Sequence, residues 1–234
     1  QYTSFWVPFF LFSGLALLLI PIMKRFLTED LDRDDNSNSS HSRIGYFQLL
    51  KYKRILFAAL AYFFTVLVVT VGQPTFGPRL THDYNFSSAL VGAWFALPTV
   101  FYILIGPIFL PIIGKKFEKR ATMMVGFFIL ACACYLIGPS NIFGLPEKST
   151  FLMIFGLWLI GTGAAFTIIP VIPEMHVAVD HKFPDQKSEL SDAFSAIFNM
   201  AGGLGQVVGP TLAGFLNDKI GFSYTFDTIG WMVL

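Results

Sequence analysis

Four polar side chains between residues 190 and 216 could do chemistry together, because their spacing matches one face of a helix. At 3.6 residues per turn they fall within a wedge of about 60°. The four are Asp192, Ser195, Asn199 and Gln206. Hydroxyl and amide groups exchange hydrogen bonds, so this face could bind a solute or bond to neighbouring helices. The carboxylate of Asp192 could exchange a proton, or it could stabilise the positive end of the helix dipole.

Glycines and prolines near this face indicate close packing and bending. Small residues let two membrane helices approach closely, and neighbouring helices can satisfy the backbone groups that a proline frees. Residues 161–174, GTGAAFTIIPVIPE, contain two prolines within an apolar run. We expect these residues to govern packing and gating: Pro170, Pro173, Gly202, Gly205, Gly209 and Pro210. The two stretches are predicted to border a solute-sized space.

Long apolar segments must position these groups. Hydrophobic residues make up 54% of the chain and charged residues 13%, whereas about a quarter of a soluble domain is charged. A helix of roughly 17 to 25 apolar residues crosses a bilayer. Six segments have at least 17 residues: 4–23, 55–73, 89–113, 121–137, 150–174 and 190–216. The sequence therefore predicts an all-α polytopic membrane protein.

The organisation of the chain follows from these segments. Residues 1–24 are predicted to form a first transmembrane helix, and 54–234 a transmembrane bundle. Between them, 25–53 is a polar segment rich in Ser, Asn and Asp, which we expect to be mobile. A final apolar run of 13 residues is too short to cross the bilayer. Because the chain opens at Gln1 and ends in this run, we expect a fragment of a longer protein.

The distribution of Lys and Arg predicts the orientation. The segments after the first, third and fifth spans hold seven, four and two of these residues, and the segments after the second, fourth and sixth hold one each. This alternation requires six complete crossings. Loops 24–54, 115–120 and 176–189 should therefore face the cytosol, or the matrix in a mitochondrion. The organelle is not defined, and a vesicular or plasma membrane is the expectation.

Polar groups in the other spans extend the candidate solute pathway. These candidates are Thr70, Gln73, Trp94, Thr99, Tyr102 and Thr167. Trp94 alone could equally be a lipid anchor, since aromatic residues gather at membrane interfaces. Ionisable groups within a membrane are costly and suggest function. Glu174 and Asp192 are accordingly candidates for ion or proton coupling.

The sequence disfavours several other functions. No basic, aromatic-interleaved patch suggests nucleic-acid binding, and no His, Cys and Asp cluster has metal-ligand spacing. Neither a Ser/His/Asp arrangement nor paired carboxylates fall at one depth, so we assign no catalytic residue, metal or cofactor and expect no enzyme. A channel is disfavoured because no charged ring or filter-like loop appears.

Several motifs together resemble a known family. Residues 75–114 contain a pattern of Val91, Gly92, Phe95, Pro98, Tyr102 and Pro107 that is similar to the helix 7–8 region of the vesicular amine and polyamine branch of the major facilitator superfamily. GTGAAFTIIPVIPEM resembles helix 10 of that branch, and the G-x-x-x-G-P at 205–210 resembles helix 11. The resemblance covers nearly the whole chain and implies helices 6 to 11, with helix 12 cut short.

The resemblance also has departures that bear on coupling. The superfamily's basic loop motif has a Gly and an Asp where this chain has Leu110 and Gly114. Acids of helices 10 and 11 that serve vesicular monoamine carriers align with Ile172 or Pro173, and with Asn199. A monoamine/proton antiporter is therefore disfavoured unless Glu174 or the other half supplies an acid.

The resemblance implies a secondary transporter of a small organic solute. It would work by alternating access with a companion N-terminal half in the lipid bilayer. The solute could be a cationic amine, and transport could be proton-coupled antiport. The alternative from another class is a transporter-derived subunit that no longer transports and docks in a larger membrane complex.

Overall fold

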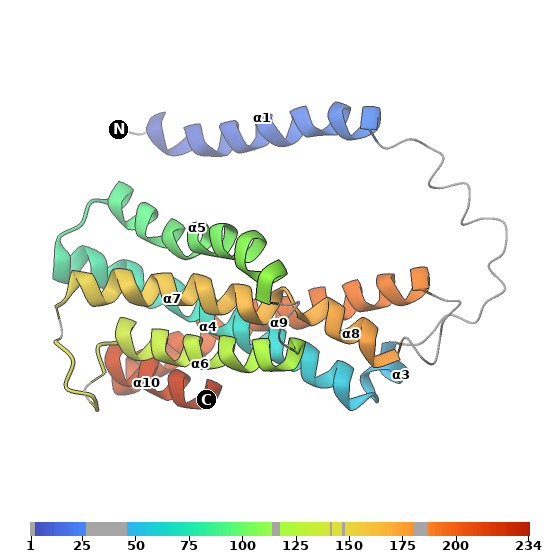
Figure 1. Cartoon of the computed structure of the whole chain (residues 1–234). Coiled ribbons are helices and arrows are strands. Elements are labelled where there is room, and N and C mark those ends of the chain that lie inside the picture. Colours follow the sequence, from blue (N-terminus) through green and yellow to red (C-terminus); the bar gives the residue numbers. More distant parts are fainter. Residues whose placement is uncertain (1–2, 27–45, 114–117, 141, 147, 180–186) are drawn as a thin grey trace. The chain divides into compact units, whose positions relative to one another are not determined.

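The computed structural model describes residues 3–26, 46–113, 118–140, 142–146, 148–179 and 187–234, all-helical apart from turns and short connections (Figure 1). The chain divides into two units, Gln1–Arg43 and Ile44–Leu234. The first unit contains helix α1, Thr3–Phe26, which matches the span predicted over 4–23. The predicted mobile segment lies largely outside the described residues. The all-α membrane architecture predicted from the sequence is confirmed.

The end of the predicted polar segment is an exception. Residues Tyr46–Leu50 form the short helix α3, and Leu49 is fully buried. Leu49 packs with Ile55, Val171 and Phe194 in one of the two hydrophobic clusters. The prediction of a loop up to residue 53 is wrong at these five residues, because Leu49 buries its side chain in this cluster.

Helix α4, Lys53–Tyr84, is longer than the sequence indicates. The second span was expected to end at Pro74 and a loop to follow, but Pro74 and Pro78 both lie inside the helix. A membrane helix tolerates such prolines where neighbouring helices and side chains satisfy the freed backbone groups. The helix ends at Asn85, whose left-handed backbone (φ 53°) lets its N–H donate to the carbonyl of Leu80.

The next three helices follow the predicted spans closely. Helix α5 runs from Ser88 to Ile113, α6 from Lys119 to Ile137, and α7 from Thr150 to Ile168. Ser149 caps α7, since its hydroxyl accepts a hydrogen bond from the backbone N–H of Leu152 at 3.4 Å.

The fifth predicted span is broken as its prolines suggest. Helix α7 stops at Ile168, and after a turn at Ile169–Pro170 helix α8 continues from Val171 to Val179. Pro173 lies in the first turn of α8, where a proline costs no intrahelical hydrogen bond. Residues 176–179, expected in a loop, therefore belong to α8, whose end buries Val179.

Two helices complete the second unit. Helix α9, Lys187–Ile220, contains Pro210 in its interior, and α10 runs from Phe222 to Val233. The main packing pairs are α6 with α7, α4 with α9 and α5 with α7, and α10 packs on α6 (Figure 1). A central cluster that includes Leu67, Leu130, Leu157 and Phe226 joins α4, α6, α7 and α10.

Four helical segments of the described chain are long and apolar enough to cross a membrane: Lys53–Tyr84, Ser88–Ile108, Lys119–Ile137 and Thr150–Val179. Helices α1 and α9 are not among them, although they have 24 and 34 residues. The polar and glycine residues of α9 lower its hydropathy. Membrane crossing by α1 and α9 therefore stays a prediction.

Candidate functional site

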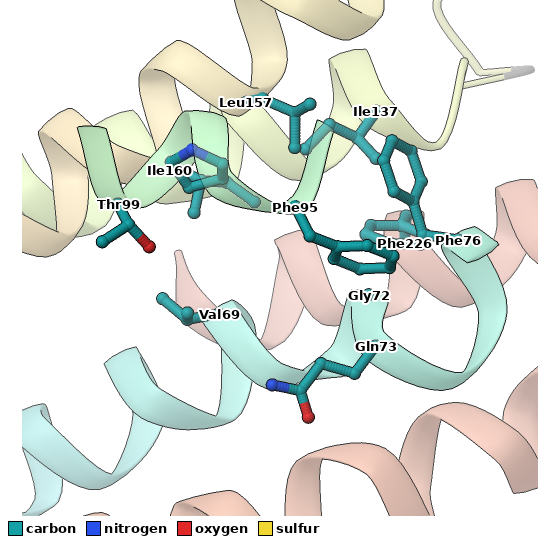
Figure 2. A pocket seen from close by; sticks show the side chains of 11 residues that line it. Val69, Gly72, Gln73, Phe76, Phe95, Thr99, Ile137, Leu157, Ile160 and Phe226 are labelled. Carbon is teal, nitrogen blue, oxygen red and sulfur yellow. The ribbon is translucent and has the colours of Figure 1, made fainter. Parts of the chain in front are cut away.

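A pocket of about 450 Å³ lies within the helical unit, between α4, α5 and α7, and α6 and α10 close it (Figure 2). Its size suits a small organic molecule. Eleven residues line it: Val69, Gly72, Gln73, Phe76, Phe95, Pro98, Thr99, Ile137, Leu157, Ile160 and Phe226. The lining contains three phenylalanines, one amide and one hydroxyl, and it carries no charge.

The position of Thr99 in this wall depends on a close contact between α5 and α7. Gly161 of α7 faces the carbonyl of Pro98, and a Cβ at Gly161 would overlap that oxygen and lie 2.9 Å from the Cβ of Phe101. A larger residue at 161 would push α5 outward. The glycine thus holds Pro98 and Thr99 against α7, where they form one side of the pocket.

The polar groups of the pocket are available to a ligand. Gln73 and Thr99 are both exposed, and neither side chain makes a hydrogen bond to any described residue. Thr167 differs, because its hydroxyl donates to the carbonyl of Gly163 at 3.0 Å. Figure 2 places Thr99 and Gln73 on different walls of the pocket.

Aromatic rings form the rest of the lining. Phe76 and Phe95 meet edge to face, with ring centroids 5.8 Å apart, and Phe226 is buried beside them. Ring faces attract cations as well as apolar groups. The pocket can therefore hold an apolar body, or an ammonium group over a ring, while the amide and hydroxyl fix its orientation.

Four other candidates from the same helices do not line this pocket. Thr70 is buried between α4 and α9, and Thr167 between α7 and α6. Trp94 is buried and stacks on Phe86, with centroids 5.7 Å apart. Tyr102 is half-buried one turn beyond Thr99. Their assignment to the solute pathway stays a prediction.

Helix α9 separates its packing face from its polar face. A Cβ at Gly202 would lie 2.7 Å from the ring of Tyr62, and one at Gly205 would lie 2.8 Å from the carbonyl of Phe63. Tyr62 also stacks on Phe198 at 3.7 Å. The glycines therefore pack α9 against α4.

The polar face of α9 is exposed. Asp192, Ser195, Asn199 and Gln206 are all exposed, and none of them lines the pocket. Apolar side chains share the exposed surface, since Met200, Leu204 and Val207 are 51%, 54% and 68% exposed. The structure thus keeps the predicted stripe together but places it apart from Gln73 and Thr99.

Glu174 forms an ion-pair cluster that sequence reasoning did not find. Its Oε1 accepts a hydrogen bond from Nε of Arg54 at 2.6 Å and from Nε of Arg120 at 2.8 Å. The Glu174 side chain is 5% exposed. The cluster joins the beginnings of α4 and α6 to α8. The sequence feature that could have indicated this cluster is the position of the two arginines: each is the second residue of its helix, at the same end of the bundle.

Asp227 of α10 is a buried acid that lies apart from the pocket and from the Glu174 cluster. It is 3% exposed, and its two carboxylate oxygens make no hydrogen bond within the described chain. The hydroxyl of Tyr135 on α6 is likewise buried and unbonded there. The sequence feature that could have indicated a buried acid is the position of Asp227 within an apolar run. No group of three or more His, Cys, Asp or Glu among the described residues could hold a metal.

Comparison with known proteins identifies the family to which the chain belongs. Two stretches of the chain, residues 1–189 and 58–234, match the Major Facilitator Superfamily. The chain is 26% identical over 222 residues to the human MFS-type transporter SLC18B1, covering 93% of this chain and 46% of the relative. It is 27% identical over 231 residues to the mouse protein of that name, covering 97% and 49%. The chain thus spans about half the length of the curated relatives it matches.

Proposed function

Because the chain belongs to the Major Facilitator Superfamily of membrane transporters, we propose that it forms the C-terminal half of a secondary transporter. This transporter moves a small organic solute by alternating access. The observation that carries the proposal is the uncharged pocket in which Gln73 and Thr99 offer unbonded polar groups among aromatic rings. Such a lining combines apolar contact with a few orienting hydrogen bonds, as small-molecule sites do.

The exposed face of α9 supplies the second part of the pathway. Asn199 and Gln206 lie on it beside exposed Met200 and Leu204. Amide groups in a membrane segment are costly toward lipid, so they favour a protein partner or a wet cavity. The companion N-terminal half would cover this face and enclose the solute between the halves.

The solute is proposed to be a cationic amine. Phenyl faces stabilise an ammonium group, and Phe76 and Phe95 lie in the pocket wall. The resemblance of the sequence motifs to those of vesicular amine and polyamine carriers supports the same class. The negative charge that an amine prefers would come from the companion half, since the pocket lining has none.

The conformational change would use the break in the fifth span. Helix α8 is separated from α7 by the turn at Ile169–Pro170, and Glu174 ties it to the starts of α4 and α6. Breaking these ion pairs would let α8 move relative to the starts of α4 and α6 when this end of the bundle closes. Proton coupling through Glu174 would require the same release, because its carboxylate is already bonded to two guanidinium groups.

The orientation belongs to this proposal. The ends of α4, α6 and α8 that carry Arg54, Arg120 and Glu174 meet on one side, as the predicted alternation of the chain requires. We place this basic side in the cytosol, or in the matrix of a mitochondrion.

The alternative is a subunit that no longer transports. Two observations favour this alternative. The carboxylate of Glu174 is already paired with arginines, and Asn199 stands at a position where amine carriers have an acid. A transport assay distinguishes the transporter from the non-transporting subunit. Proteoliposomes that contain this chain together with its N-terminal half are tested for uptake of radiolabelled monoamines and polyamines. Uptake above that of empty vesicles supports transport. A lack of uptake for every amine, with and without a pH gradient, supports the subunit.

A further inference from the structure

A second pocket, of about 520 Å³, lies beside the Glu174 cluster and has a charged end and an apolar end. Lys53, Arg54 and Arg120 line it together with a single carboxylate, that of Glu174. The three cations outnumber the one acid, so the pocket keeps a net positive charge. We propose that it binds the phosphate headgroup of an anionic phospholipid.

The guanidinium groups leave donors for a phosphate. Arg54 and Arg120 each use the Nε–H to bond Glu174. Their terminal nitrogens make no hydrogen bond to any described residue. A guanidinium binds phosphate oxygens through such paired N–H groups. The side chains are accessible, with 36% of Arg54 and 58% of Arg120 exposed.

The position of the cluster matches the depth of lipid headgroups. Arg54 and Arg120 are the second residues of two candidate membrane spans, Lys53–Tyr84 and Lys119–Ile137. They therefore lie where hydrocarbon gives way to the polar interface. Basic pockets between helices at this level bind anionic headgroups.

The apolar end of the pocket fits the acyl chains. Phe57 follows Arg54 by three residues and Met124 follows Arg120 by four, so each lies about one turn deeper on the face of its arginine. Phe57 is 66% exposed and Met124 is 73% exposed. A bound lipid would place its phosphate on the arginines and its chains over these two side chains.

The proposal does not depend on transport, and a binding measurement tests it. The intact protein in detergent is given phosphatidylglycerol or phosphatidylcholine with the same acyl chains, and bound lipid is counted by native mass spectrometry. We expect preferential retention of phosphatidylglycerol. Arg120→Gln should weaken it about tenfold, the effect of removing one charge-assisted contact. Equal retention of the two lipids, or unchanged binding in Arg120→Gln, would overturn the proposal.

Two further variants keep the result specific. Arg79→Gln removes an arginine from the other end of α4 and should leave lipid retention unchanged. Met124→Gln alters an exposed side chain without disturbing packing and should lower retention of phosphatidylglycerol. Glycerol 3-phosphate, which has no acyl chains, should not displace the lipid at equal concentration. Displacement at equal concentration would show a site for soluble phosphates and would also overturn the lipid assignment.

Discussion

Gly209 of α9 lies directly against Thr70 of α4, so that a Cβ at position 209 would overlap the Thr70 hydroxyl oxygen. The same Cβ would lie 2.8 Å from the carbonyl oxygen of Leu67. Thr70 turns its hydroxyl to the carbonyl of Val66 at 2.8 Å, which keeps the polar atom satisfied within the contact. A small residue is therefore required where these two helices cross.

This contact predicts that Gly209→Ala destabilises the protein. The added methyl group must push α9 from α4, and overpacking of this kind costs about 1 to 3 kcal/mol. Thermal unfolding in detergent measures the effect. Gly203→Ala on the same helix is the matched control, since no atom lies within 4 Å of its Cβ position. It should be neutral or stabilising by up to about 1 kcal/mol, and equal losses in both variants would contradict the contact.

The Glu174 cluster predicts a large loss of stability in Glu174→Gln. The substitution leaves two guanidinium groups without their shared carboxylate, and breaking a buried ion pair costs about 3 to 5 kcal/mol. We expect less than this, because both arginines are partly exposed. Thermal unfolding again reports the change.

Asp83→Asn is the control for that variant. Asp83 pairs with Arg79 at 3.4 Å within α4, and its side chain is 42% exposed. Because the carboxylate is exposed, we expect the pair to contribute about 0 to 1 kcal/mol, as surface ion pairs do. If both substitutions lower stability equally, the cluster does not hold α4, α6 and α8 together.

Asp227 predicts the opposite effect on stability. A buried carboxylate without hydrogen-bond partners carries a desolvation cost, which the neutral amide of Asp227→Asn reduces. We expect stability to rise by about 1 to 3 kcal/mol. Asp218→Asn, at an exposed position near the end of α9, should change little. A marked loss in Asp227→Asn would mean that the carboxylate is bonded in the folded protein.

The sequence was sufficient to predict which segments form helices, but not where each helix ends. Apolar length and the Lys and Arg pattern depend on the bilayer, which acts on each segment separately, so the spans could be predicted. The second span was predicted to stop at residue 73, just before Pro74, and α4 continues past it because neighbouring helices decide whether a proline ends a membrane helix. The break at Pro170 could be anticipated because the missing N–H of a proline ends a helix locally, and α7 stops just before the turn at Ile169–Pro170. The gating role expected of Pro170 stays a prediction.

The candidate site was harder to predict than the fold. Helical periodicity groups residues on one helix, and it found the exposed face of α9. It could not show that Thr70 and Thr167 point into helix contacts while Thr99 faces the pocket, since all three are threonines in apolar spans. The pairing of Arg54 with Glu174 joins residues 120 apart in the chain and depends on tertiary packing.

The most direct test of the account is amine uptake by proteoliposomes that hold the protein with both halves, comparing wild type with Gln73→Leu and Thr99→Val. Each substitution removes one polar group from the pocket, so we expect KM to rise roughly tenfold. Thr81→Val, at an exposed position near the end of α4 where the hydroxyl bonds only its own helix, should leave uptake unchanged. Wild-type KM in both pocket variants would contradict the claim that this pocket binds the transported solute.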